Sequence, residues 1–168
     1  AIFFLAPDDN AMPTGGKHHV VEVTDANFEA EVLNSKVPVV IDFYATWCDP
    51  CKQYSPIFHK VSNDYVGKVK FVAIDVDKAP NVAALFGIGS IPTTLIVRPE
   101  ADGSHSLGGI PGGLTESILK QVIDFGIDPK SELVNARFEK DDKGAIQVKF
   151  NLPEETKPVE KDEDPAKQ

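Results

Sequence analysis

Residues 47–52 of this chain read Trp47-Cys48-Asp49-Pro50-Cys51-Lys52. The stretch holds both cysteines of the protein, separated by two residues. A crosslink stabilises a fold less as the loop that it closes becomes shorter, so a disulfide between these thiols would be a poor brace. It would be a good reversible redox couple, because the second thiol always lies within reach of a mixed disulfide on the first. The stretch therefore predicts redox chemistry rather than a structural crosslink.

The flanking segments predict a strand that leads directly into a helix. Residues 37–44 form a near-continuous apolar run, which is typical of a strand buried on both faces. A helix is expected to begin at the two cysteines, with Pro50 in its first turn, where a backbone N–H is not required. Pro56 lies inside the same helix and is expected to kink it. This places Cys48 at the N-terminus of a helix.

The rest of the chain alternates between strand and helix patterns. Strands are expected at residues 19–24, 69–76, 93–97 and 105–107, and helices at residues 25–33, 81–86 and 114–126. Thr24 or Asp25 is the expected N-cap of the first helix. The alternation predicts a parallel core, to which the adjacent strands near the end add an antiparallel edge. The expected fold class is therefore α/β, with a central mixed sheet flanked by helices.

Four segments are expected along the chain. Residues 18–126 complete the α/β domain, and residues 1–17 form an N-terminal segment before it. Residues 127–152 form a C-terminal extension, in which two apolar runs flank residues 141–144 and predict a β-hairpin. Residues 153–168 are rich in proline and charge, which predicts an acidic disordered tail.

Composition narrows the classes of partner. The chain has 168 residues, 42% of them hydrophobic, which suits one compact domain with a proper core, and we expect a monomer. The net charge of −9 argues against binding to nucleic acid or to an anionic membrane surface, since both favour a basic patch. No stretch approaches the roughly 20 apolar residues that cross a bilayer.

The first residues bear on the cellular compartment. Residues 1–6 are apolar, and the loop-like residues 7–16 follow them. One interpretation is the remnant of a signal peptide or of a membrane anchor, which predicts an extracytoplasmic, periplasmic protein. The alternative is a short segment that docks on the domain of a cytoplasmic protein. Contact with a membrane is expected only if the segment belongs to an anchor.

Over residues 18–126 the sequence resembles the thioredoxin family. The likeness rests on four separate elements: residues 40–52 with Asp42 six positions before Cys48, Pro56 in the active-site helix, the loop Gly89-Ser90-Ile91-Pro92-Thr93, and Gly108-Gly109. In the family the loop carries a cis-proline, and a glycine just after the last strand lines the substrate groove. The resemblance implies the thioredoxin fold, here with a C-terminal extension.

The chain also departs from the family pattern. Thioredoxins proper have Gly-Pro between the cysteines, and this chain has Asp49-Pro50. A lysine that members often carry near the buried aspartate is replaced by Ala73. The loop at residues 99–104 and everything after Asp128 lie outside the common pattern. The extension and tail are loosely similar to exported bacterial thioredoxins.

The resemblance implies a thiol-disulfide oxidoreductase that reduces protein disulfides. Cys48 would attack the disulfide of a partner protein, and Cys51 would resolve the mixed disulfide. Asp42 is the candidate general base for Cys51, because burial should raise its pKa towards neutrality; the alternative is that it only forms local hydrogen bonds. No cofactor is expected beyond the redox-active disulfide Cys48–Cys51. The electron donor would be a reductase or a membrane thiol-relay protein.

The substrate surface is expected around Cys48. The candidate residues are Trp47, Asp49, Pro50, Ile91, Pro92 and Gly109. Pro92 would present the neighbouring backbone as a β-edge to an extended substrate if its peptide bond is cis. Trp47 is expected to be exposed for contact, with burial in the core as the alternative. The charge of Asp49 should disfavour a thiolate on Cys48, which predicts a reductant rather than a strong oxidant.

Three other functions compete with this interpretation. A structural zinc site needs four ligands, and the four histidines are scattered, so no metal is expected. A disulfide isomerase or oxidase would need a less stable disulfide and, usually, a dimerisation or binding module. A non-catalytic binding subunit could use the thioredoxin fold as a scaffold, but the intact cysteine pair argues against it.

Overall fold

The computed structural model describes residues 19–151. The expectations for residues 1–17 and for the tail at residues 153–168 lie outside the described residues. Within residues 19–151, no helix is long and apolar enough to cross a membrane.

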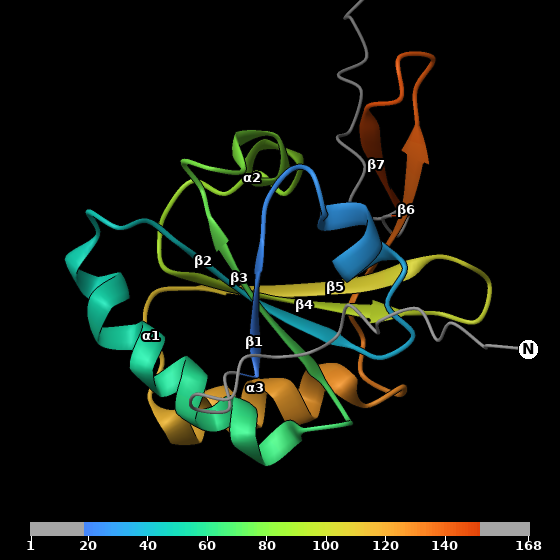
Figure 1. Ribbon diagram of the computed structural model, residues 1–168. Coiled ribbons are helices and arrows are strands. Elements are labelled where there is room, and N and C mark those ends of the chain that lie inside the picture. The colour runs from blue at the N-terminus through green and yellow to red at the C-terminus, as the bar shows by residue number, and fades with distance from the viewer. Residues whose placement is uncertain (1–18, 152–168) are drawn as a thin grey trace, which may run out of the picture.

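A central sheet of seven strands organises the molecule, in the order β1-β3-β2-β4-β5-β6-β7 (Figure 1). The strands are β1 (Val20–Val23), β2 (Val39–Tyr44), β3 (Lys70–Asp75), β4 (Thr93–Pro99), β5 (His105–Pro111), β6 (Val134–Lys140) and β7 (Ile146–Asn151). Pairing is parallel among β1, β3 and β2, and antiparallel from β2 through β4 to β7. The predicted mixed sheet of an α/β fold is confirmed.

Helices cover both faces of the sheet. They are η1 (Glu29–Leu33), α1 (Asp49–Ser62), η2 (Asn63–Tyr65), α2 (Pro80–Leu85) and α3 (Glu116–Ile127). Helices α1 and α3 pack on one face, where Phe58 and Leu119 join Val40 in one apolar cluster. On the other face, η1 and α2 supply Phe28 and Val82 to a second cluster (Figure 1).

Strand β2 leads to the cysteines and is buried on both faces, as its apolar run predicted. Successive side chains of a strand point to opposite faces, so Val40 and Asp42 share the face that α1 and α3 cover. Ile41 and Phe43 belong to the cluster on the other face. The helix α1 begins at Asp49 and contains Pro56 in its interior, where the proline has no backbone N–H to donate.

The first helix differs from the sequence-based expectation. Residues Glu29–Leu33 form a short π-helix, in which the N–H of Asn34 donates to the carbonyl of Glu29. Neither Thr24 nor Asp25 caps it; its N-cap position is Phe28. The carboxylate of Asp25 instead accepts the backbone N–H groups of Asn81 and Val82 at the start of α2. A capping residue can serve a helix that is distant in sequence, which a local pattern does not reveal.

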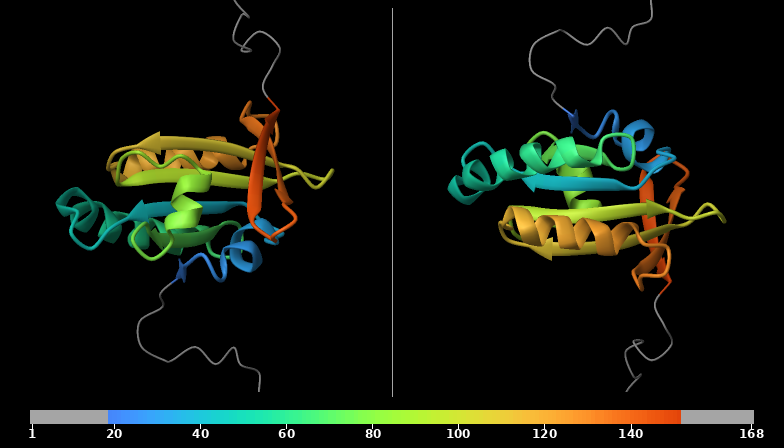
Figure 2. Two further views of the ribbon diagram at one scale, coloured as in Figure 1. Left: turned by 90° about the horizontal axis from the view of Figure 1, so that it is seen from above. Right: turned by 90° about the horizontal axis from the view of Figure 1, so that it is seen from below.

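The C-terminal extension adds two strands to the sheet. Strand β6 pairs with β5 through Ala136 opposite His105, and β7 pairs with β6 in a hairpin. Ala136 is buried, and the ring of Phe138 lies 5.3 Å from that of His105. Figure 2 shows the hairpin crossing one end of the sheet at a steep angle to the other strands. The extension is thus part of the folded sheet.

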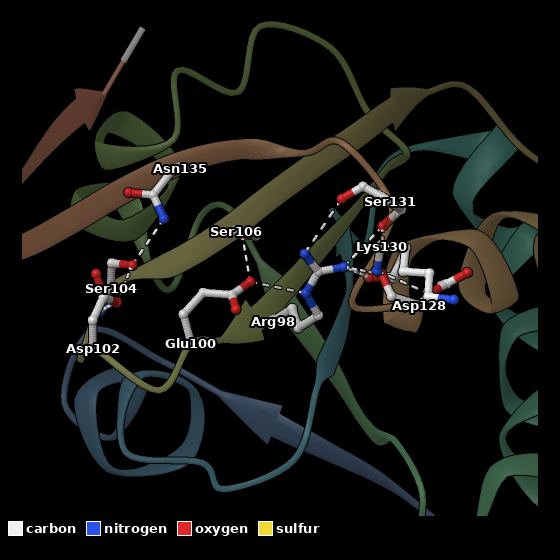
Figure 3. Close-up of polar contacts among 10 residues, drawn as sticks. Arg98, Glu100, Asp102, Ser104, Ser106, Asp128, Lys130, Ser131 and Asn135 are labelled. Carbon is white, nitrogen blue, oxygen red and sulfur yellow. Dashed lines mark hydrogen bonds and ion pairs between the residues drawn. The ribbon is translucent and has the colours of Figure 1, made fainter.

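A buried arginine joins the end of α3 to the sheet and to the start of the extension. Arg98 on β4 is only 6% exposed. Its Nη1 donates to the carbonyls of Gly126, at 3.1 Å, and Asp128, and to Ser131 Oγ at 2.8 Å (Figure 3). Its Nε donates to Glu100 Oε1 at 2.9 Å. The last carbonyls of a helix have no partner within the helix, so the guanidinium supplies donors that they need.

Candidate active site

The two cysteines lie at the start of α1 and form a disulfide, with their Cα atoms 5.3 Å apart. Cys48 is the N-cap residue of the helix, and its sulfur accepts the backbone N–H of Cys51 at 3.3 Å. Pro50 lies in the first turn, as expected. Cys48 is 5% exposed and Cys51 is 1% exposed, so Cys48 is the more accessible of the two.

This position determines the chemistry of Cys48. The first N–H groups of a helix lack partners within the helix, and together they form its positive end. A sulfur placed there is stabilised as a thiolate, which is the nucleophilic form of cysteine. Once the disulfide is reduced, the helix start therefore favours negative charge on Cys48.

Asp42 lies behind the cysteines on β2 and is 1% exposed. Ser55 Oγ donates to its Oδ2 at 3.3 Å, whereas its buried Oδ1 has no protein partner. Burial raises the pKa of Asp42 to about 7, the hydrogen bond from Ser55 opposes the rise, and the charge of Glu22 adds to it. The carboxyl group therefore gains and loses its proton near neutral pH, as its buried position predicted.

A cavity of about 440 Å³ opens beside Cys51. Its walls come from the end of β2 and from the first turns of α1, and they include Tyr44, Thr46, Cys51, Lys52, Ser55 and His59. Ser55 thus contacts the buried carboxyl group of Asp42 and also lines a space that reaches Cys51. Water in such a cavity would lie beside Cys51 and Ser55.

Two residues border Cys48 at the surface. Trp47 is 67% exposed, and its Nε1 donates to Asp77 Oδ2 at 2.8 Å, so the alternative of a core tryptophan is wrong. Ile91 packs against the cysteine pair, and its carbonyl oxygen lies 3.8 Å from Cys48 Sγ. The Ile91–Pro92 peptide bond is cis, and Pro92 is buried. The backbone before Pro92 therefore lies directly beside the reactive sulfur.

The expected position of Gly109, just after the last strand, is wrong. Strand β5 runs to Pro111, so Gly109 lies within it rather than just after it. A Cβ on Gly109 would make a tight contact of 3.2 Å with Leu95 Cδ1. The glycine that follows the strand is Gly112, which has a φ of +92° and donates its N–H to the carbonyl of Pro92 at 2.8 Å. The Pro111-Gly112 turn signal in the sequence could have identified it.

Asp49 is directed to solvent. Its side chain is 86% exposed and forms an ion pair with Lys52, with Nζ 3.3 Å from Oδ1. Both charges are exposed, and water screens each of them. The effect of Asp49 on Cys48 is thus weakened by solvent and by a cation one turn along the helix.

Potential metal ligands are dispersed. Among residues 19–151, no group of three or more His, Cys, Asp and Glu side chains is arranged to hold a metal ion.

Comparison with known proteins identifies the family. The sequence profile of the Thioredoxin family matches residues 19–124. The chain belongs to the thioredoxin family. The thioredoxin of Porphyra purpurea is 39% identical over 104 residues, covering 62% of this chain and 97% of that protein. Thioredoxin 1 of Nostoc sp. is 38% identical over 103 residues, covering 61% of this chain and 92% of that protein.

A solved structure agrees with the assignment. Chloroplastic thioredoxin z superposes with a TM-score of 0.56 at 26% identity, covering 62% of this chain and 91% of that chain. The thioredoxin fold and the predicted activity are confirmed: the protein is a thiol-disulfide oxidoreductase that reduces disulfides of protein substrates. Its thioredoxin region has relatives of nearly the same length, and the C-terminal hairpin follows that region.

Sequence analysis missed three residues close to the site. Ser55 contacts Asp42, and Tyr44 lines the cavity and donates to Glu22 at 3.0 Å. Helical spacing places Ser55 one turn after Cys51, on the same side of α1, and this signal could have found it. Glu22 lies on β1, and only the strand order brings it towards Asp42.

Proposed function

We propose that Cys48 is the attacking thiol of this disulfide reductase, and Cys51 the resolving thiol. The observation that supports the assignment is the N-cap position of Cys48, which is also the less buried of the two cysteines. The Cys48 thiolate attacks one sulfur of the substrate disulfide, and the other substrate sulfur leaves with the bonding electrons and takes a proton. A mixed disulfide between Cys48 and the substrate results.

Asp42 serves the second step as a general base. Its carboxylate takes the proton of the Cys51 thiol through water, and the Cys51 thiolate then attacks Cys48. The substrate leaves as a second thiol, and the protein holds the Cys48–Cys51 disulfide. The raised pKa of Asp42 supports this role, because a base that changes state near pH 7 can both accept and return the proton.

The substrate chain is proposed to lie across Trp47, Pro50, Ile91 and Pro92, with Asp49 at the margin. The support is the carbonyl of Ile91, 3.8 Å from Cys48 Sγ, which is placed to accept a backbone N–H of an extended substrate. Gly112 is proposed to line the substrate surface in place of Gly109, because its N–H donates a hydrogen bond to the carbonyl of Pro92.

The test compares two cysteine variants in the reduction of insulin by dithiothreitol. We expect Cys48→Ser to lose all catalysed reduction. Cys51→Ser should also lose turnover, but it should accumulate a mixed disulfide with the substrate through Cys48, visible by mass spectrometry. Catalysed reduction by Cys48→Ser, or a mixed disulfide formed through Cys51 instead, would contradict the assignment.

The redox-active group is proposed to be the Cys48–Cys51 disulfide alone, recharged by a reductase or by a membrane thiol-relay protein. A cytosolic form would use an NADPH-linked reductase, and an exported form a relay protein. Reduction of the purified oxidised protein by an NADPH-linked thioredoxin reductase, measured as NADPH consumption, distinguishes the two donors.

We further propose a monomer located outside the cytoplasm. The proposed location is supported by the apolar residues 1–6. The proposed monomeric state is supported by the composition, which suits a single compact domain. Cell fractionation of the native protein tests the first point, and light scattering after size exclusion tests the second. Recovery in the cytoplasmic fraction, or the mass of a dimer, would refute the respective proposal.

A further inference from the structure

Three side chains from neighbouring strands form a row behind the cysteines. In the register of the sheet, Ala73 on β3 pairs with Glu22 on β1 and with Asp42 on β2. Register partners in adjacent parallel strands point to the same face, so both acids face the α1 side with only a methyl group between them. Two strand spacings separate their backbones by roughly 10 Å. This is close enough for one charge to affect the other where protein, rather than water, fills part of the space.

Glu22 accepts hydrogen bonds from a neighbour that favour its charged form. Tyr44 donates its hydroxyl to both carboxylate oxygens of Glu22, at 3.0 and 3.1 Å. Burial raises the pKa of Glu22, while this hydrogen bond and the charge of Lys78 oppose the rise. A donor to a carboxylate favours the ionised state, so the row presents a negative charge to Asp42.

Ser55 acts on Asp42 from helix α1. Its hydroxyl donates to Asp42 Oδ2 at 3.3 Å, which favours the carboxylate. Ser55 also lines the cavity that reaches Cys51. Glu22 therefore favours a proton on Asp42, and Ser55 favours its release.

The remaining polar groups around Asp42 come from each element packed against it. Thr94 on β4 is its register partner and is bonded to the hydroxyl of Tyr54 on α1 at 2.7 Å. Asp75 on β3 is the register partner of Tyr44 and adds negative charge at the end of the row. Cys51 and His59 on α1 line the cavity beside Ser55. Among all the polar groups around Asp42, Glu22 and Ser55 are those that change the pKa of its carboxyl group.

We propose that Glu22 and Ser55 are positioning residues that set, in opposite directions, the pH at which Asp42 exchanges its proton with Cys51. This proposal rests on the proposed role of Asp42. When a thiol donor reduces the disulfide, Cys51 leaves with the electron pair of the S–S bond and takes the proton of neutral Asp42. Asp42 is left as a carboxylate. During substrate reduction the Cys51 proton returns to the carboxylate.

The experiment uses the full chain in its oxidised form, with Glu22→Gln and Ser55→Ala as the two variants. The ionisation midpoint of Asp42 is followed by carbon-13 NMR of its carboxyl group, with the signal assigned through its loss in Asp42→Asn. We expect Glu22→Gln to lower the midpoint by about half a pH unit. Ser55→Ala should raise it by a similar amount, and Ser55→Thr, which keeps the hydroxyl group, should restore it.

Glu139→Gln provides the matched control. It removes the same charge from the hairpin, where Glu139 pairs with Lys149. Its Asp42 midpoint should equal that of the unaltered protein. The pH profile for reduction of the disulfide by dithiothreitol, followed by the fluorescence of Trp47, should move with the NMR midpoint in each variant.

Opposite displacements by Glu22→Gln and Ser55→Ala, with none in the control, support the proposal. Unchanged Asp42 midpoints, or displacements in the same direction in both variants, overturn the proposal for Glu22 and Ser55. They do so even if the unaltered protein reduces insulin as expected. If Asp42→Asn resolves the mixed disulfide at the normal rate, the proposed role of Asp42 fails. If the NMR midpoints of Asp42 move in the variants but the pH profile of disulfide reduction does not, Asp42 does not exchange its proton with Cys51. That result would overturn the proposal as well.

Discussion

Two buried ionisable residues, Asp42 and Arg98, lie on the same face of the sheet but near opposite ends of it. Asp42 is near the end of β2, and Arg98 is near the end of the antiparallel neighbour β4. Asp42 accepts one hydrogen bond from Ser55 and leaves Oδ1 without a protein partner. Arg98 donates to Glu100, to Ser131 and to two carbonyls at the end of α3 (Figure 3).

The difference separates a reactive group from an anchor. A buried charge with few hydrogen bonds is costly, so it changes its protonation state instead, and the pKa of Asp42 is raised to about 7. A guanidinium does not lose its proton in proteins, and many acceptors compensate its burial. The cysteine end of the sheet therefore responds to pH, while the Arg98 end fixes the helix and the extension in place.

Asp42→Asn is expected to have the largest effect. We expect resolution of the mixed disulfide at pH 7 to slow on the order of 100-fold, because Cys51 loses its base. Rapid mixing of the reduced variant with a disulfide peptide measures the rate. A rate equal to that of the unaltered protein would show that another group accepts the proton.

The same substitution should stabilise the oxidised protein at high pH. The folded pKa of about 7 exceeds the ordinary value of 3.8, so the folded state holds the proton more tightly than the unfolded chain does. Stability therefore falls as pH rises from about 4 to 7, by up to about 4 kcal/mol. Asp42→Asn should remove this fall in urea unfolding at pH 5 and pH 8, whereas Asp142→Asn in the exposed hairpin turn should keep it.

Arg98→Ala tests the anchor. We expect the free energy of unfolding to decrease by about 3 kcal/mol, because carbonyls at the end of α3 and the carboxylate of Glu100 lose their donor. Arg98→Lys should recover only part of the loss, since lysine lacks the planar fork. Urea unfolding measures both variants. If Arg98→Ala slowed mixed-disulfide resolution as strongly as Asp42→Asn, the two ends of the sheet would not be functionally separate.

Arg137→Ala provides the exposed counterpart of Arg98. Arg137 pairs with Asp102 at 2.9 Å, and about half of its side chain is in solvent. An exposed ion pair of this kind contributes less than about 1 kcal/mol. Urea unfolding should therefore show a small loss, reduced further by salt. A loss equal to that of Arg98→Ala would mean that hairpin docking, and not burial of the guanidinium, dominates this end.

Asp49→Gly should have the smallest effect. Removing a negative charge near Cys48 favours its thiolate, and therefore the reduced protein, so the reduction potential should rise by about 10 mV. Lys52→Gln should lower it by a similar amount, since it removes the opposite charge of the pair. Equilibration with glutathione measures both. A fall in potential for Asp49→Gly would refute the electrostatic account.

Much of the site follows from local sequence. The spacing of Cys48 and Cys51, the proline in the first turn and the apolar run around Asp42 specify a dithiol at a helix start with a buried acid behind it. Ser55 and Gly112 also carried local signals, in helical spacing and in a Pro-Gly turn. Gly109 was placed after the strand because two glycines inside a strand resemble the end of that strand. The structure shows only that a Cβ at this position would lie close to Leu95 Cδ1.

Strand order and register lay beyond the sequence. Nothing local indicates that Glu22 and Asp42 share a row across Ala73, that Asp25 caps a helix more than 50 residues away, or that β6 pairs with β5 at His105. In the sequence, Arg98 is an ordinary strand residue, and only the fold brings its hydrogen-bond acceptor on α3 next to it.

The sequence alone thus determined the elements, their alternation and the reactive cysteine pair, because periodicity, turn residues and thiol spacing act over a few neighbouring residues. Only the tertiary structure decided which acid faces Asp42, which glycine supports Pro92 and how the extension joins the sheet. Those features depend on burial and on contacts between segments distant in the chain, and their energies exist only once the sheet has formed.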